Sequence, residues 1–264
     1  SSTSTDHMTV YGYKTSQIGA SLGTRFQQYE NLYFSPSLAA NFETLKTTDS
    51  ASVALKKQKG DYNDLNFNYS LDYDLRNQRY QTSDGFRNVF YQELPVISES
   101  YEITNQFQTS FYKKIIPSSD MIGRASLYTK AVNTLTNKDV RISKRLYIPQ
   151  SKLRGFESGK VGPRDGTGFV GGNYITTLNL SSTLPQILPS FQNLDVSFFI
   201  DAANIWGVDY DSSLNESNKI RSSTGVAMDI LTPIGPLNFS LSQPITKSSS
   251  DITETFRFNL GTTF

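Results

Sequence analysis

The residues of this chain that could take part in chemistry are few and lie far apart. His7 is the only histidine among 264 residues, and there is no cysteine. A histidine-based triad or a metal site needs several such side chains together, so the sequence predicts no enzyme, no metal and no other cofactor. Gly162-Pro163 and Gly171-Gly172 do not form the pattern of a phosphate-binding loop after a strand.

A charged motif in the longest connection is the strongest functional signal. An arginine offers a planar fork of donors, a glycine permits unusual backbone angles, and a phenylalanine can anchor a segment against an apolar surface. A mobile, Gly-rich surface loop has the same composition, but long loops without structure are uncommon unless they are functional. The motif reads Arg154-Gly155-Phe156, followed by Gly162-Pro163-Arg164-Asp165 and Gly171-Gly172-Asn173.

The elements that must position this motif show an alternating pattern. Residues 64–75 alternate between apolar or aromatic and polar side chains, which predicts a strand with one apolar and one polar face. No window of useful length shows the three-and-four spacing of a helix. The predicted strands are 16–27, 31–43, 62–76, 86–97, 101–113, 121–133, 173–184, 192–206, 220–232, 236–245 and 252–264, with a further partial strand around 8–13.

Alternation alone does not say which face contacts water, so a soluble β-sandwich or barrel remains an alternative. Three features favour a transmembrane antiparallel β-barrel: strands of about 10–13 residues, long connections that all fall at one end, and a terminal aromatic residue of the apolar parity. Charges on the polar parity also suit a solvated lumen better than a packed core. These charges are Arg25, Asp72, Arg124, Asp201 and Arg257.

Composition narrows the possible partners. The net charge of +1 argues against a general nucleic-acid binder. No apolar run reaches the length of a transmembrane helix, which does not exclude a membrane-spanning barrel. Aromatic residues make up 12% of the chain, with 15 Tyr and 17 Phe, and tyrosine suits the girdles at membrane interfaces.

Motifs in the second half of the chain carry a resemblance to a known family. Together with the loop motif, and in the same order, they resemble the BamA family of outer-membrane protein assembly factors, the bacterial surface antigen barrels. The strand motif, with Ala203 where glycine is usual, is Phe198-Phe199-Ile200-Asp201-Ala202-Ala203-Asn204-Ile205-Trp206, the late turn is Thr232-Pro233-Ile234-Gly235-Pro236-Leu237, and the closing strand contains Phe256, Phe258, Leu260 and Phe264.

The resemblance implies an all-β fold that is one part of a larger barrel. Members of the family have a barrel of about sixteen strands that follows periplasmic POTRA domains. We therefore expect residues 1–264 to be a single partial barrel domain with about eleven strands and an inserted loop at about 134–172, without the POTRA domains and the first strands. The implied location is the outer membrane of a Gram-negative bacterium.

The resemblance also implies a function without covalent chemistry. Such a protein folds nascent β-barrel proteins into the outer membrane, and its partners are outer-membrane lipid, those nascent proteins and accessory lipoproteins. In the family, the arginine of the inserted loop reaches an aspartate on a later strand. Parity independently puts Asp201 on the polar face, so we expect Arg154 to pair with Asp201 and hold the loop in the lumen. The family often adds an acidic residue on the intervening strand, where Ser181 is the inward position here.

Other functions remain open at this point. A TamA-like protein or a two-partner secretion transporter shares the loop motif and the barrel. A porin-like channel would have the barrel and the terminal phenylalanine, but no Arg-Gly-Phe loop folded inside. A soluble carbohydrate-binding sandwich is a more distant alternative.

Overall fold

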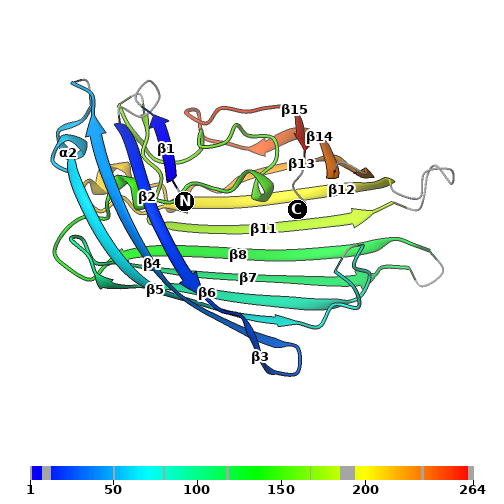
Figure 1. Cartoon of the computed structure of the whole chain (residues 1–264). Coiled ribbons are helices and arrows are strands. Elements are labelled where there is room, and N and C mark those ends of the chain that lie inside the picture. Colours follow the sequence, from blue (N-terminus) through cyan, green and yellow to red (C-terminus); the bar gives the residue numbers. More distant parts are fainter. Residues whose placement is uncertain are drawn as a thin grey trace.

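A single curved antiparallel sheet forms the wall of the molecule (Figure 1). The computed structural model describes residues 2–7, 13–49, 51–79, 81–116, 119–166, 168–184, 194–232 and 235–260. Strands follow one another in the order of the sequence, from β1 to β15, except that β3 pairs only with β4 and that β9 and β10 form a separate hairpin. The strands are β1 (Ser2–His7), β2 (Tyr13–Gly23), β3 (Phe26–Tyr29), β4 (Leu32–Thr47), β5 (Gly60–Asp74), β6 (Gly85–Ile97), β7 (Glu102–Lys114), β8 (Ile122–Thr134), β9 (Arg164–Asp165), β10 (Gly168–Phe169), β11 (Tyr174–Thr183), β12 (Leu194–Trp206), β13 (Arg221–Thr232), β14 (Gly235–Thr246) and β15 (Phe256–Leu260).

Every strand predicted from alternation has a counterpart in the sheet, with ends that differ by a few residues. The first predicted strand, 16–27, is divided into β2 and β3. The partial strand expected around residues 8–13 lies largely outside the described residues, but β1 precedes it and pairs with β2. The β9–β10 hairpin was not predicted, because two-residue strands leave no alternation to detect.

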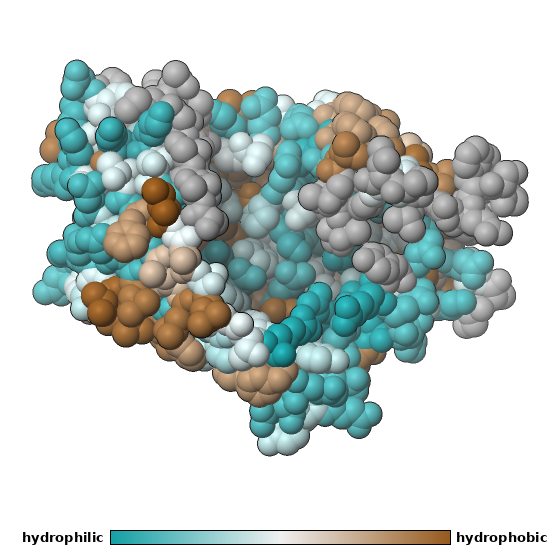
Figure 2. Space-filling view, in the orientation of Figure 1, coloured by the Kyte–Doolittle hydropathy of each residue, from teal (hydrophilic) through white to brown (hydrophobic). Residues whose placement is uncertain are grey.

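The two faces of the sheet differ in polarity as the alternation predicted. Outward side chains are apolar and exposed: Leu22 is 83% exposed and Phe258 49%. Inward side chains are polar and shielded: Thr177, Asp201 and Ser223 are all 0% exposed. Figure 2 shows the hollow lined largely by hydrophilic residues, whereas apolar residues gather on the outer surface. Because the apolar face has no protein covering among the described residues, this arrangement fits a wall that contacts lipid.

The longest connections lie at one end of the sheet, on the left in Figure 1. They are residues 48–59, which contain the short helix α2 (Val53–Lys56), residues 135–173 and residues 207–220, which contain the 3-10 turn η3 (Ser212–Leu214). The three longest connections thus lie at the predicted end, but the asymmetry is incomplete. The β6–β7 connection at the same end is only residues 98–101, and the β5–β6 and β11–β12 connections at the opposite end are residues 75–84 and 184–193. Among the described residues, no helix has the length and hydropathy needed to cross a membrane.

The inserted loop, residues 135–173, occupies the hollow of the sheet. It contains the 3-10 turns η1 (Ile142–Lys144) and η2 (Gln150–Lys152) and the β9–β10 hairpin. Its apolar side chains are buried against inward residues of β8, β11 and β12. This burial is inconsistent with the alternative of a mobile surface loop and agrees with the expectation of a loop held in the lumen. The cluster comprises Val140, Leu146, Ile148, Leu153, Phe156 and Val161 from the loop and Tyr128, Val132, Ile175, Ala203 and Ile205 from the strands.

Candidate functional site: the inserted loop and its anchors

Arg154 of the inserted loop forms a two-pronged ion pair with Asp201 of β12. Its Nε donates to Asp201 Oδ2 at 2.7 Å, and its Nη2 donates to Asp201 Oδ1 at 2.8 Å. The backbone N–H of Arg154 also donates to Asp201 Oδ2, at 3.1 Å. The Asp201 side chain is 0% exposed and that of Arg154 15% exposed. Removing one partner of a buried pair costs about 3–5 kcal/mol, because the other charge is left uncompensated.

Asn179 of β11 completes the set of donors around Asp201. The two residues are directly opposite each other in the β11–β12 register, and Asn179 Nδ2 donates to Asp201 Oδ1 at 2.8 Å. The same amide donates to the backbone oxygen of Lys152 in the loop, at 2.8 Å. Ser181, the inward position considered from the sequence, lies opposite Phe199 instead. The neutral amide of Asn179 therefore supports the Asp201 carboxylate from this strand.

Phe199 provides an aromatic surface beneath Arg154. It breaks the polar parity of β12, yet it is only 2% exposed, and the guanidinium carbon of Arg154 lies 3.5 Å from its ring centroid. A cation over an aromatic face adds about 0.5–2 kcal/mol, depending on desolvation. Phe199, the apolar residue that interrupts the polar face of β12, is thus the residue that contacts Arg154 of the inserted loop.

Gly155 allows the loop to pass very close to the wall. Its φ is +87°, and a Cβ at this position would lie 3.2 Å from the Cβ atoms of both Ser223 and Ser242. Ser223 Oγ donates to the backbone oxygen of Arg154. A larger residue is therefore disfavoured both by backbone angle and by space.

Phe156 links the loop to the segment that leads into the closing strand. Its side chain is 2% exposed within the apolar cluster, and its backbone forms a bridge with Thr253. Backbone hydrogen bonds flank this bridge, from Glu254 N to Gly155 O at 3.1 Å and from Glu157 N to Ile252 O at 3.0 Å. The loop thus pairs with the segment that immediately precedes β15.

Arg257 of β15 reaches back to hold the same loop. Its Nη1 donates to the backbone oxygen of Gln150 at 2.9 Å, and its Nη2 donates to that of Phe156 at 2.5 Å. Glu254 pairs with the same guanidinium at 3.0 Å. From the sequence, Arg257 could be placed only among the charges of the lumen, since nothing in the sequence relates it to a segment about a hundred residues away.

The other closing-strand residues named from the sequence face outward. Phe256, Phe258 and Leu260 are 55%, 49% and 56% exposed. Phe264 lies outside the described residues. The strand therefore presents its apolar parity to the membrane while Arg257, on the opposite parity, clamps the loop.

The second loop motif packs away from Asp201. Gly162 N donates to Asp251 Oδ1 at 3.3 Å, and Pro163 is buried next to it. The Arg164 guanidinium lies 5.1 Å from the ring centroid of Phe169 across the β9–β10 hairpin. Asp165 accepts a hydrogen bond from the hydroxyl of Tyr210, in the connection after β12, at 3.1 Å. This motif thus joins the loop to its neighbours at the long-connection end.

A third anchor, which the sequence analysis missed, lies at the start of the loop. Arg141 is 1% exposed and pairs with three carboxylates on three strands of the far wall, and its guanidinium carbon lies 4.3 Å from the Tyr62 ring centroid. The pairs are with Asp64 at 2.6 Å, Glu43 at 3.3 Å and Glu102 at 3.6 Å. The loop therefore spans the hollow from β4, β5 and β7 to β12 and β15. The sequence did contain one indication of this anchor, because Glu43, Asp64 and Glu102 are all carboxylates on the polar faces of their strands.

The contacts of this site bind and position the inserted loop. In the described part of the chain, no three His, Cys, Asp or Glu residues are placed to hold a metal ion. The ion pairs that hold the loop are structural contacts between its own side chains and the wall. What this site can do is fix the shape of the barrel interior and the position of β15.

Comparison with known proteins identifies relatives of the whole sheet. The model of the Omp85 superfamily domain matches residues 2–264. Among curated proteins, the chain is 32% identical over 141 residues to the outer membrane protein assembly factor BamA of Neisseria meningitidis serogroup B, and 26% identical over 144 residues to that of Neorickettsia risticii. These alignments cover 42% and 53% of this chain, but only 17% and 19% of the relatives.

Solved structures show the same fold. BamA from Haemophilus ducreyi lacking POTRA domains 1-3 superposes with a TM-score of 0.84 at 22% identity, over 93% of this chain and 54% of that structure. CdiB from Acinetobacter baumannii superposes with a TM-score of 0.59 at 10% identity, over 94% of this chain and 42% of that structure. The sheet is thus a portion of a transmembrane β-barrel, as expected, and it spans about half of the barrel proteins it matches.

Proposed function

The chain belongs to the Omp85 superfamily, and on that premise we propose that it is the barrel portion of a BamA-like factor that assembles β-barrel proteins in the bacterial outer membrane. The observation that carries the proposal is the inserted loop held inside the hollow by Arg154 and Asp201. In this reading the domain is a partial barrel with the loop inserted between β8 and β11. Its partners are outer-membrane lipid, incoming barrel proteins and accessory lipoproteins.

The loop supports a mechanism in which the closing strand is presented as a template. Among the described residues, β15 pairs with β14. The other edge of such a strand, where it is not paired within the barrel, offers backbone donors and acceptors that can bind an incoming strand by β-augmentation. Arg257 and the backbone bonds around Phe156 fix this strand from the inside, so the edge is held ready without covalent chemistry.

The packed interior argues against a porin-like channel. A channel needs a continuous aqueous path, whereas the inserted loop buries Phe156, Leu153 and Val161 in the hollow. The same loop and sheet would suit a TamA-like or secretion-type relative, in which the route of the substrate differs. An assay of assembly therefore has to distinguish these functions.

The test replaces the chromosomal copy of the full-length gene with an Asp201→Asn variant and measures folded outer-membrane proteins by heat-modifiable gel mobility. We expect folded barrel proteins to decrease, because the loop loses its charged anchor. Asp195→Asn is a matched control on the same strand and parity, with only a 3.5 Å contact to Gln81. Normal levels of folded barrel proteins after depletion of the wild-type protein would refute the assembly function.

A further inference from the structure

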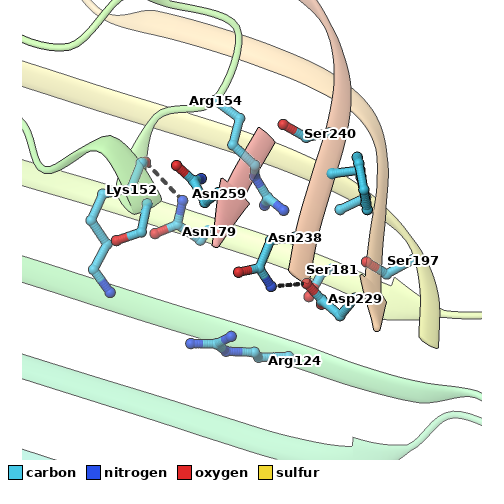
Figure 3. Close-up of a pocket in the computed structure, with 13 residues that line it drawn as sticks. Arg124, Lys152, Arg154, Asn179, Ser181, Ser197, Asp229, Asn238, Ser240 and Asn259 are labelled. Atoms are coloured by element: carbon cyan, nitrogen blue, oxygen red, sulfur yellow. Dashed lines mark hydrogen bonds between the residues drawn. The ribbon is translucent and has the colours of Figure 1, made fainter. Parts of the chain in front are cut away.

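A polar cavity lies in the hollow beneath the inserted loop (Figure 3). Its walls come from β8, β11, β12, β13, β14 and β15, and Lys152 and Arg154 of the inserted loop also line it. The cavity has a volume of about 80 Å3. That volume accommodates a small anion or a few waters.

Two cations of the cavity form no close ion pair among the described residues. Arg154 is committed to Asp201, but neither Arg124 of β8 nor Lys152 has a carboxylate within ion-pair distance among the described residues. Arg124 lies over the Tyr112 ring at 5.5 Å, and Lys152 over the Tyr128 ring at 5.6 Å. Aromatic faces weakly stabilise a cation and leave its hydrogen-bond donors unused.

The unused donors are the second indication of a ligand. Nε of Arg124 is buried and has no hydrogen-bond acceptor in the described structure. A buried donor left without an acceptor costs about 1–3 kcal/mol, so such groups usually bind water or a ligand. The cavity also exposes hydroxyl groups with no recorded side-chain hydrogen bond among the described residues, namely Ser181, Ser197 and Ser240.

We infer that this cavity binds a small oxyanion, a phosphate or carboxylate group held between Arg124 and Lys152. Both cations project into the same space, one from the wall and one from the loop (Figure 3). Charge-assisted bonds from a guanidinium and an ammonium, with hydroxyl donors beside them, are the usual means of oxyanion recognition. Burial, together with the nearby positive charge of Arg124, lowers the pKa of Lys152 to about 8, so an anion would relieve the repulsion between the two cations.

Asp229 allows a test in which anion binding should become stronger, beside the tests in which it should become weaker. Its carboxylate lines the same cavity and accepts a hydrogen bond from Asn238 Nδ2. A negative charge there opposes the binding of an anion. Neutralising Asp229 should therefore strengthen binding, whereas neutralising Arg124 or Lys152 should weaken it.

The experiment measures phosphate binding to the full-length protein in detergent, by equilibrium dialysis with labelled inorganic phosphate at low chloride. We expect saturable binding of one equivalent per chain. Arg124→Gln and Lys152→Gln should each weaken it about tenfold, since each removes a hydrogen bond to a charged group. Asp229→Asn should tighten it, a gain that misfolding does not produce. Competition by acetate distinguishes a site for carboxylates from one selective for phosphate.

Lys113→Gln is the matched control, because this lysine is exposed and pairs with Asp84 outside the cavity. Heat-modifiable mobility verifies that each variant is folded. Absence of saturable binding to the wild-type protein would overturn the inference. So would equal affinities of the wild type and the two cavity variants, or a loss in Lys113→Gln as large as theirs. The readout is binding alone, so the result is independent of assembly activity.

Discussion

The guanidinium of Arg154 lies against Phe199, with its carbon 3.5 Å from the ring centroid, while Asp201, two residues further along the same strand, accepts hydrogen bonds from its donors. Phe199 supplies an aromatic surface for the guanidinium, and Asp201 supplies a negative charge. Because successive inward residues of a strand are two positions apart, both reach the same arginine. This relationship explains why an aromatic residue occupies the polar parity of β12.

Substitution of Phe199 separates the aromatic contribution from packing. Phe199→Leu keeps most of the apolar volume and should cost about 1–2 kcal/mol through loss of the cation–π contact. Phe199→Ala also leaves a cavity and should cost about 3–5 kcal/mol. Urea unfolding of the full-length barrel in detergent measures both. Equal losses in the two variants would contradict a specific role for the ring.

Replacement of Arg154 by lysine tests the geometry of the ion pair. Arg154→Lys retains the charge but cannot donate two parallel hydrogen bonds to Asp201. We expect the inserted loop to become accessible to protease almost as readily as in Arg154→Ala. If the lysine variant is as resistant as the wild type, charge alone holds the loop and the two-pronged contact is unimportant.

Two glycines of the inserted loop can be compared to test how closely the loop backbone approaches the wall of the sheet. Gly155 and Gly166 both have positive φ, at +87° and +62°, but only Gly155 has wall atoms close to the position that a Cβ would take; Gly166 has none within 4 Å. Gly166→Ala should cost about 1–2 kcal/mol, from backbone conformation alone. Gly155→Ala should cost more, because Ser223 and Ser242 must also move. Thermal unfolding of the two variants measures the difference, and a larger loss at Gly166 would be inconsistent with this packing.

Arg257 should control the local stability of the closing strand. Arg257→Met removes the donors to Gln150 O and Phe156 O, which leaves both carbonyls without those partners. Hydrogen exchange should then accelerate about tenfold at the neighbouring backbone amides, which open together. Arg87→Met is the control, since Arg87 pairs with Asp72 on the far wall. Unchanged exchange in Arg257→Met would show that the clamp is dispensable. The amides to follow are those of Glu157, Ile252 and Glu254.

Lys152 gives a prediction for pH. Burial and the positive charge of Arg124 lower its pKa from 10.5 to about 8, against the opposing effect of Asp201. The folded state therefore holds this proton less tightly than the unfolded chain, so this group adds stability as pH rises from about 8 to about 10.5. In an NMR titration of methylated lysines, Arg124→Gln should move the pKa of Lys152 upward. An unshifted value would mean that the two cations are not close.

Much of the fold could be predicted because the alternation of a strand is a local property. Leu22 and Phe258 face outward and Asp201 inward, as parity required. The prediction of Arg154 as the partner of Asp201 depended on parity together with a family resemblance. Asn179 was not predicted, because its role depends on the register between β11 and β12, which places it opposite Asp201.

The sequence by itself determined the strands of the main sheet, the face that their residues join and the end at which the three longest connections lie, because each follows from the two-residue repeat and the order of turns. Only the tertiary structure decided which inward residues meet the inserted loop. Arg141 joins three strands of one wall and Arg257 returns from the other, although both are separated from their partners by long stretches of chain. Such contacts depend on how the sheet curves around the loop, and no local pattern of residues records that curvature.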